Sequence, residues 1–359
     1  MENLTMPNFL KKDFSAFNFD FENKFDQKEI NALNLLKECA NNTILVCNGK
    51  VFLKNVDKNL SISTQEIASE EKTDKILFLN KEFLNSSLNI ATKKNFKHKK
   101  LNILFVANGQ KFHKTNLVFE QGSEIEIFEK VVSFGELKLN YHLNVIAKPN
   151  SHAKYVVFED IEDGESNVFA HTFKLDSDAN FDFKLLNLSK ANVMNLTYGD
   201  LLGKGSQVNV ETFAFAGGKT VFKNLIMLTH LARETTSDMN NIAVVNGHGN
   251  ITIDGIGKIE KSFGKSDAGQ HSKIVLLEES ALATVNPQLI INEFDVKAGH
   301  AAAVGGLDPE QIYYLQSRGL SKAQATSLLV FSYASKLFEV LPENEKQIAT
   351  ELIAKLIEK

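Results

Sequence analysis

Short segments that alternate apolar and polar residues dominate the chain between about residues 43 and 306. Segments such as SEIEIF, NFDFKLLNL, SQVNVETFAF and NITIDGIGKI place β-branched or aromatic residues at every second position. A period of two is typical of β-strands that have one face buried. No long helical pattern separates these segments, which argues against alternating β-α-β units and predicts a mainly β protein.

These segments recur at a nearly constant spacing. A small residue opens an alternating run at six positions: Ser123, Ala153, Ala179, Ser206, Gly249 and Ala281. Four of the five intervals lie between 26 and 32 residues. That length is too long for hairpins and suits one coil of a β-solenoid, for which we expect three sides. The remaining interval of 43 residues indicates an extra turn or a loop around His230 to Asn246.

A β-sandwich is the alternative architecture, because it also has short strands at regular spacing. The chain has no proline between Pro149 and Pro287. Central strands of a solenoid pair through both edges and need every backbone N–H, so this proline-free stretch favours the solenoid.

The two ends of the chain differ from this β region. Residues 1–42 contain a phenylalanine-rich segment and then an amphipathic stretch from Ile30 to Cys39, which predicts an irregular arm followed by a helix. Three helix-start signals follow residue 306: Asp308-Pro309, Ser321 with Gln324, and Pro342. We therefore expect a β-strand region over 43–306, with its solenoid core at about 100–306, and a helical domain over 307–359.

Composition argues against several classes of partner. The chain has 40 Lys+Arg and 44 Asp+Glu, a net charge of −4, which gives no electrostatic reason to bind nucleic acid or an anionic membrane. We find no apolar run of the roughly 18 residues needed for a membrane span, and no secretory signal pattern. With only Cys39 and Cys47, a disulfide framework is not expected, and the expected location is cytoplasmic.

Common catalytic motifs are also missing from the sequence. It has no GxGxxG, HExxH or GxSxG pattern. A phosphate-binding loop needs a glycine five residues before Gly-Lys-Thr/Ser, and here those positions are Phe213 and Ile259. The sequence therefore argues against the commonest enzyme classes.

The segment from Gln270 to Gly319 carries the most specific pattern in the chain. Its characteristic elements are Asn286-Pro287-Gln288-Leu289, Asp295-Val296-Lys297, His300, Val304-Gly305, Leu307-Asp308, Glu310 to Leu315, and Ser317-Arg318-Gly319. In order and spacing these resemble the signature of the SufB/SufD family, the scaffold subunits of the SUF iron–sulfur cluster assembly machine. The pattern is most similar to the D-type subunit, SufD.

Two departures from the family pattern concern cysteine. D-type members commonly have a cysteine two residues before the histidine, where this chain has Ala298. B-type members have a Gln-Cys pair where this chain has Gln270-His271. Iron–sulfur clusters are usually held by several thiolates, so we expect this chain to bind no cluster stably by itself.

The resemblance implies a right-handed parallel β-helix core with flanking amino-terminal and carboxy-terminal α-helical regions. It implies a heterodimer with a SufB-type subunit through the last β-helix coils, and docking of the SufC ATPase on the carboxy-terminal helices. The chain would then be a non-catalytic scaffold subunit of the SufBCD complex, with a transient iron–sulfur cluster at the SufB interface. The sequence leaves open whether the chain also forms a homodimer.

His300 is the residue expected at the metal site, because neutral imidazole ligates iron and the family's equivalent histidine faces the partner. His271 lies 29 residues earlier, about one coil. Residues one coil apart stack about 4.8 Å apart, so the hypothesis is that both imidazoles face one interface; a surface or core histidine is the alternative.

For SufC the candidate contact residues are Tyr313, Tyr314, Gln316 and Arg318, since tyrosine and arginine are enriched at interface centres. The alternative is that the tyrosines close the end of the β-helix.

The alternative function is a β-helix carbohydrate-active enzyme, a polysaccharide lyase or hydrolase. Its carboxylate cluster would be the acidic run Glu159-Asp160-Ile161-Glu162-Asp163, although a charge-rich turn of this kind is more often a solvated loop. The other histidines occur singly, so no role is assigned to them, and both cysteines are expected to be buried apolar residues.

Overall fold

The computed structural model describes residues 30–66, 75–97, 100–164 and 166–357. The predicted irregular arm and His98 lie outside these residues. The amino-terminal part comprises α1 (Ala32–Glu38), β1 (Thr43–Cys47), β2 (Lys50–Lys54), β3 (Leu60–Ser63), α2 (Lys75–Glu82), β4 (Ser86–Thr92), β5 (Lys100–Phe119) and β6 (Glu124–Ala147). Shorter strands follow: β7 (His152–Asp160), β8 (Asn167–Leu175), β9 (Asn180–Asn187), β10 (Val193–Leu201), β11 (Gln207–Ala216), β12 (Val221–His230), β13 (Thr236–Val245), β14 (Asn250–Ile259), β15 (Asp267–Leu276), β16 (Leu282–Ile291) and β17 (Lys297–Gly306). The chain then forms α3 (Pro309–Ser317), α4 (Lys322–Glu339) and α5 (Glu343–Ile357).

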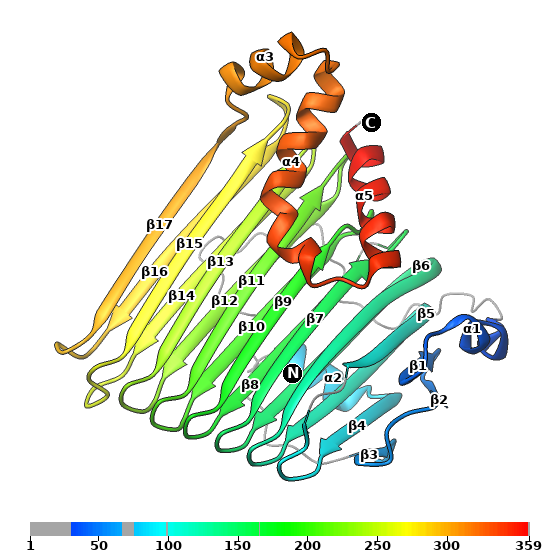
Figure 1. The fold of residues 1–359 in the computed structure, drawn as a ribbon, viewed down its shortest axis with the longest axis vertical. Coiled ribbons are helices and arrows are strands. Elements are labelled where there is room, and N and C mark those ends of the chain that lie inside the picture. Colours follow the sequence, from blue (N-terminus) through cyan, green and yellow to red (C-terminus); the bar gives the residue numbers. More distant parts are fainter. Residues whose placement is uncertain (1–29, 67–74, 98–99, 165, 358–359) are drawn as a thin grey trace.

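The β region is a parallel β-helix, as the spacing predicted (Figure 1). From β7 onward each strand pairs in parallel with the second strand after it, such as β11 with β13 and β12 with β14. Strands β7, β9, β11, β13, β15 and β17 form one sheet, here called the front sheet. Strands β8, β10, β12, β14 and β16 form the back sheet, and each coil adds one strand to each sheet.

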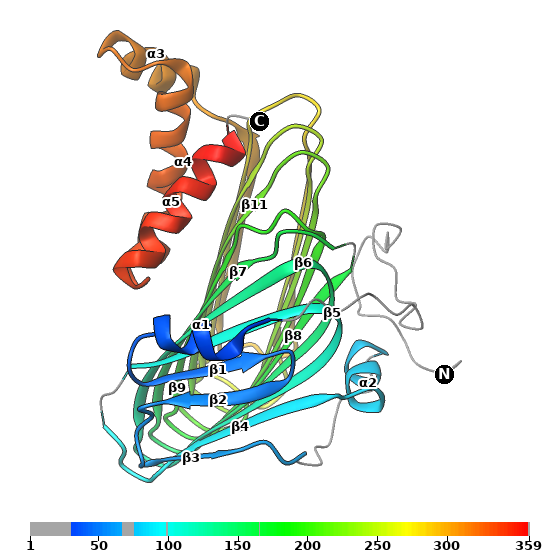
Figure 2. The ribbon, with the colours of Figure 1, turned by 90° about the vertical axis from the view of Figure 1, so that its right-hand side faces the viewer.

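The expectation of three sides per coil is wrong, because only two strands occur in each coil (Figure 2). The 43-residue interval also follows from the two-sided coil. Ser206 precedes β11 of the front sheet, whereas Gly249 precedes β14 of the back sheet, so the interval is one coil and a half. The loop expected around His230 to Asn246 is instead the regular strand β13.

The longest strands bend from one sheet into the other. Residues 124–132 of β6 pair with β7, and residues 140–147 pair with β8. Strand β5 pairs in the same way with β1 and β4. At this end, β2 pairs with β1 and β3 pairs with β4 in antiparallel fashion, which covers the first coil. Helix α1 packs there through Leu35 and Leu36, while Leu33 is exposed.

Alternate residues of both sheets point into the lumen and form the main core. Aromatic rings stack from coil to coil, with Tyr155 and Phe183 at 6.3 Å between ring centroids and Phe173 and Phe181 at 4.8 Å. Because the side-chain period is two, alternate residues of the strands before β17 form apolar rows in this core. The short helix α2, which periodicity did not predict, covers the outer face of the back sheet through Ile76.

The carboxy-terminal helices begin and end where their capping signals predict. Asp308 accepts a hydrogen bond from the N–H of Glu310, and Gly319 ends α3 with φ of +94°. Ser321 and Gln324 form the capping box of α4.

Helices α4 and α5 pack on the outer face of the front sheet (Figure 2). Val330 and Ile353 share a buried apolar cluster with Phe158 and Phe213. A largely buried ion pair, Lys130 Nζ to Glu345 Oε2 at 2.6 Å, links β6 to α5. Among the described helices, none is long and apolar enough to cross a membrane.

Candidate functional site

The last coil of the β-helix has two free edges. Within the described residues, β16 pairs only with β14, and β17 pairs only with β15. Every residue of β17 is exposed, in contrast to the buried rows of the strands before it. An uncovered strand edge presents unpaired N–H and C=O groups, so this end of the solenoid can pair with another strand.

Backbone geometry shows which groups point out of these edges. The N–H of Lys297 donates to the carbonyl of Ser266, and the N–H of Leu282 donates to the carbonyl of Gly249. Since successive residues alternate between the two edges, the backbone N–H of His300 points out of the free edge of β17. Pro287 occupies an outward position of β16, where its missing N–H costs no hydrogen bond in the sheet.

His300 lies at the mouth of the lumen. It pairs with Gln270, whose side chain is only 2% exposed and points inward. His300 is on the same inward row, but it is exposed because no coil follows β17. Ala298 and Ala302, the next residues on this row, are also exposed and have small side chains.

The predicted stacking of His271 on His300 is wrong. His271 pairs with Ala301, because this coil has 30 residues and not 29. A shift of one residue turns a side chain to the opposite face of a strand. His271 is therefore exposed on the outer face, the face from which Lys273 reaches Tyr333 of α4 (Nζ to OH, 3.2 Å).

The remaining candidate residues lie on α3. Tyr313 and Tyr314 are 75% and 56% exposed, Gln316 and Arg318 are also exposed, and the Arg318 guanidinium lies 5.2 Å from the ring centroid of Tyr314. A hollow of about 400 Å³ separates α3 from α4 and is lined by Tyr314 and Leu328 among others. Because both tyrosine side chains are exposed on α3, they do not close the end of the β-helix, which was the alternative to a role in binding.

A family model described as the SufBD core domain of the SUF system for FeS cluster assembly matches residues 104–333. The chain belongs to the SufBD family. The matched region begins within β5 and ends within α4, so it includes the open last coil and α3.

The curated relatives of this SufBD-family chain include D-type proteins. It is 27% identical over 235 residues to iron-sulfur cluster assembly protein SufD of Bacillus subtilis (strain 168), and 26% identical over 234 residues to SufD of Escherichia coli (strain K12). These alignments cover 64% of this chain and 54% and 55% of the two relatives. Protein ABCI7, chloroplastic, of Arabidopsis thaliana is 26% identical over 239 residues, covering 64% of this chain and 49% of the relative. The chain thus spans about half the length of the curated relatives it matches, and the D-type resemblance is confirmed.

No ready-made metal site occurs in this SufBD-family chain: the described residues contain no group of three or more His, Cys, Asp or Glu side chains placed to hold a metal ion. Cys39 and Cys47 lie near the opposite end of the solenoid, beside and within β1 (Figure 1). Burial raises the pKa of both thiols, which disfavours the thiolate form.

The acidic run does not form a carboxylate cluster. Glu159 points into the lumen, where its Oε2 accepts hydrogen bonds from Asn187 Nδ2 (2.6 Å) and Asn195 Nδ2 (3.0 Å). Asp160 points to the opposite face, since it is the next residue of the same strand, and Glu162 and Asp163 are exposed in the turn beyond. These carboxylates are therefore not arranged as the pair that a glycosidase needs.

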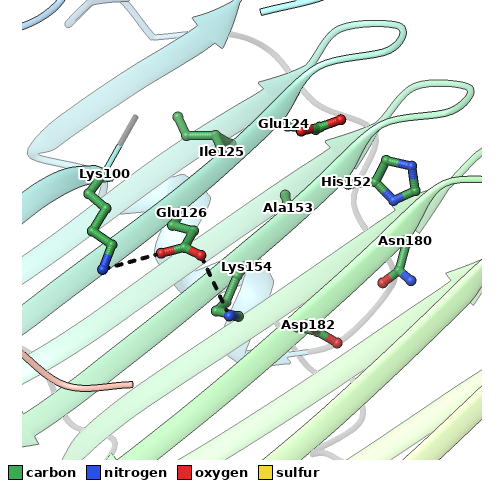
Figure 3. Close-up of a pocket in the computed structure, with 9 residues that line it drawn as sticks. All are labelled: Lys100, Glu124, Ile125, Glu126, His152, Ala153, Lys154, Asn180 and Asp182. Atoms are coloured by element: carbon green, nitrogen blue, oxygen red, sulfur yellow. Dashed lines mark ion pairs between the residues drawn. The ribbon is translucent and has the colours of Figure 1, made fainter. Parts of the chain in front are cut away.

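A second group of carboxylates lines a hollow of about 490 Å³ on the outer face of the front sheet (Figure 3). Glu126 is bridged by Lys100 and Lys154, each at 3.6 Å, and Glu124 pairs with Lys97. These ion pairs occupy Glu124 and Glu126, so these two carboxylates do not resemble a catalytic acid–base pair either.

The lumen contains a buried polar network that sequence reasoning missed. Glu129 accepts hydrogen bonds from Tyr141 (2.7 Å) and Tyr155 (2.5 Å), and Tyr141 contacts Thr115 at 2.8 Å. Burial raises the pKa of Glu129 to about 7, although both tyrosine hydroxyls oppose this shift. Buried histidines behave oppositely: burial lowers the pKa of His113 and His171 to about 3, and hydroxyl side chains contact both rings.

Replacing Glu129 with glutamine is expected to flatten the dependence of stability on pH. A carboxyl whose folded pKa is about 7 and whose ordinary value is 4.5 contributes stability below pH 4.5, and this is lost as pH rises through 7. Between pH 6 and 8 the native chain should lose about 1.4 kcal/mol relative to Glu129→Gln, measured by urea unfolding at both pH values. The buried histidines stay neutral over this window in the folded chain; parallel pH curves for the two proteins would refute the assignment.

Proposed function

We propose that this chain is a non-catalytic scaffold subunit of SUF iron–sulfur cluster assembly. It pairs through its last coil with a SufB-type, cysteine-bearing relative and docks the SufC ATPase on its carboxy-terminal helices. The observation that carries the proposal is the open last coil with His300 at the mouth of its lumen. The names of its SufD relatives support the same assignment.

The partner surface combines free backbone groups with exposed apolar side chains. Leu282 and Val304 are exposed on the two strands of the last coil, and Phe294, between them, is fully exposed. A strand added to a free edge gains backbone hydrogen bonds, and exposed apolar groups gain from burial against it. A relative that ends in a similar open coil meets both requirements.

The cluster is cargo that the two subunits hold in common. Among the described residues, His300 is the imidazole at the proposed seam, and a cluster usually needs several thiolate ligands. Its own cysteines lie near the other end of the solenoid, so the thiolates come from the partner. Because the ligands come from two subunits, we expect the cluster to be bound transiently at the seam between them. It becomes exposed when the subunits move.

The ATPase surface is α3 with the neighbouring hollow beside α4. This SufBD-family sequence carries no phosphate-binding loop, so the energy for moving the scaffold comes from SufC. The exposed tyrosines and Arg318 have the residue types that dominate binding energy at interfaces.

Changing Arg318 to glutamate is expected to weaken SufC binding by about tenfold, because an exposed interface arginine is replaced by the opposite charge. The affinity of SufC is measured by its binding to the full chain immobilised on a sensor surface. Lys58→Glu makes the same charge change at an exposed site near the other end of the β-helix and should have no effect. Equal affinity of native chain and Arg318→Glu would remove α3 from the docking surface.

Co-purification of the tagged full chain from its native cell tests the whole proposal. The expected result is a complex with a cysteine-bearing SufBD relative and an ABC-type ATPase, with iron and acid-labile sulfide present. Recovery of the chain only as a homodimer, or activity on an acidic polysaccharide, would contradict it.

A further inference from the structure

We propose that Gln270 is a positioning residue for His300: its side-chain oxygen accepts the imidazole N–H and fixes which ring nitrogen faces the partner subunit. This inference rests on the proposed function of His300. Gln270 would touch neither iron nor sulfide; it acts only through the imidazole.

The two side chains are neighbours by strand register. Gln270 on β15 and His300 on β17 are paired residues, and both belong to the inward row. Paired side chains on adjacent parallel strands lie about 4.8 Å apart at their bases, within reach of a long amide and an imidazole. No other side chain intervenes between them along this row.

The amide of Gln270 is held on its other side. Its Nε2 donates a hydrogen bond to the backbone carbonyl of Gln288 at 2.8 Å, across the lumen. Two glycines of β14 make room for it: a Cβ on Gly257 would lie 2.8 Å from Nε2, and one on Gly255 would lie 3.1 Å from Oε1. The local sequence thus accommodates an extended glutamine at this position.

The oxygen of this amide lacks a partner. Gln270 is 2% exposed, and its Oε1 has no hydrogen-bond donor in the structure. A buried acceptor left unsatisfied costs about 1–3 kcal/mol, so a donor is expected when the site is complete. On the preceding coil the paired residue is Met239, which cannot donate. On the following coil it is His300, whose neutral ring has one N–H.

A histidine that donates one ring N–H to an oxygen presents the lone pair of its other nitrogen in a fixed direction. This arrangement sets the tautomer and makes the ring a better metal ligand. With its N–H held inside the lumen by Gln270, the other nitrogen of His300 points outward, toward the coil that a partner would add.

The test is the tautomeric state of His300 in the full chain at pH 8, read from ¹⁵N chemical shifts of selectively labelled histidine. His300→Asn identifies the signals. We expect one dominant tautomer in the native chain and a mixture of both in Gln270→Met, which keeps the side-chain length but removes the acceptor. Ser272→Ala removes the next inward polar group and should leave the tautomer unchanged. A native chain with mixed tautomers, or identical shifts in Gln270→Met, would overturn the inference.

A second measurement separates this inference from the proposed function. In the complex with the partner subunit, Gln270→Met is expected to lower the recovered iron and sulfide by about tenfold, as loss of a hydrogen bond behind a metal ligand does. If the tautomer changes in Gln270→Met but the native complex acquires no cluster, the positioning contact stands and the proposed function fails. If the native complex acquires its cluster with mixed His300 tautomers, the proposed function stands and the inference about Gln270 fails.

Discussion

The His300→Asn variant is expected to lose at least about 90% of the iron and sulfide recovered with the native complex. The substitution removes the only imidazole that the described residues present at the proposed seam, and asparagine is a poor ligand for iron. Because His300 is exposed and asparagine keeps a side-chain N–H donor, the thermal midpoint of the isolated chain should stay nearly the same. Iron and acid-labile sulfide are measured on the co-purified complex, together with its subunit ratio.

His271→Ala is the matched control for this experiment. It removes an exposed imidazole from the neighbouring strand, but from the outer face of the sheet. We expect its cluster content to equal that of the native complex. Equal loss in both variants would show that the imidazoles act together despite their opposite faces. Retention of cluster in His300→Asn would refute the assignment of His300.

The Ala302→Pro variant is expected to weaken association with the partner subunit by about 100-fold, which corresponds to about 3 kcal/mol. The backbone N–H of residue 302 points out of the free edge of β17, as does that of His300, so proline removes a donor that only another chain can use. Pro287 already occupies an outward position on β16, which shows that the other free edge of the last coil accommodates proline. Dissociation constants are measured by titration of the purified partner subunit.

Ala302→Val controls for the added bulk, because it keeps the N–H and has a side chain of similar size. It should bind the partner with native affinity, and both variants should unfold at the native temperature. Native affinity of Ala302→Pro would mean that the partner contacts this end of the β-helix without pairing with β17.

The repeated period-two segments sufficed to predict a β-solenoid, because alternation and coil length are both local properties of the sequence. The absence of proline between Pro149 and Pro287 correctly favoured strands paired on both edges. Helix boundaries at Asp308, Ser321 and Gly319 also followed from local capping chemistry. The family signature is likewise a property of the sequence alone.

The number of sides per coil and the register were not predictable in the same way. The intervals from Ser123 to Ala281 mixed starts of front-sheet and back-sheet strands, which look alike in sequence. Paired residues of β15 and β17 are 30 positions apart in the sequence, whereas His271 and His300 are 29 apart. The two histidines therefore lie on opposite faces of the sheet. A bend that loses or gains one residue changes little in the local pattern but reverses the face of every side chain after it.

The sequence by itself determined that this SufBD-family chain builds a parallel β-helix, where its carboxy-terminal helices begin, and that His300 belongs to the family signature. Only the tertiary structure decided that the last coil is uncovered, that His300 shares an inward row with Gln270, and that Glu159 and Asp160 diverge. The physical reason is that strand propensity and capping act over a few residues, whereas register, edge exposure and the lumen arise from pairing between coils about 30 residues apart.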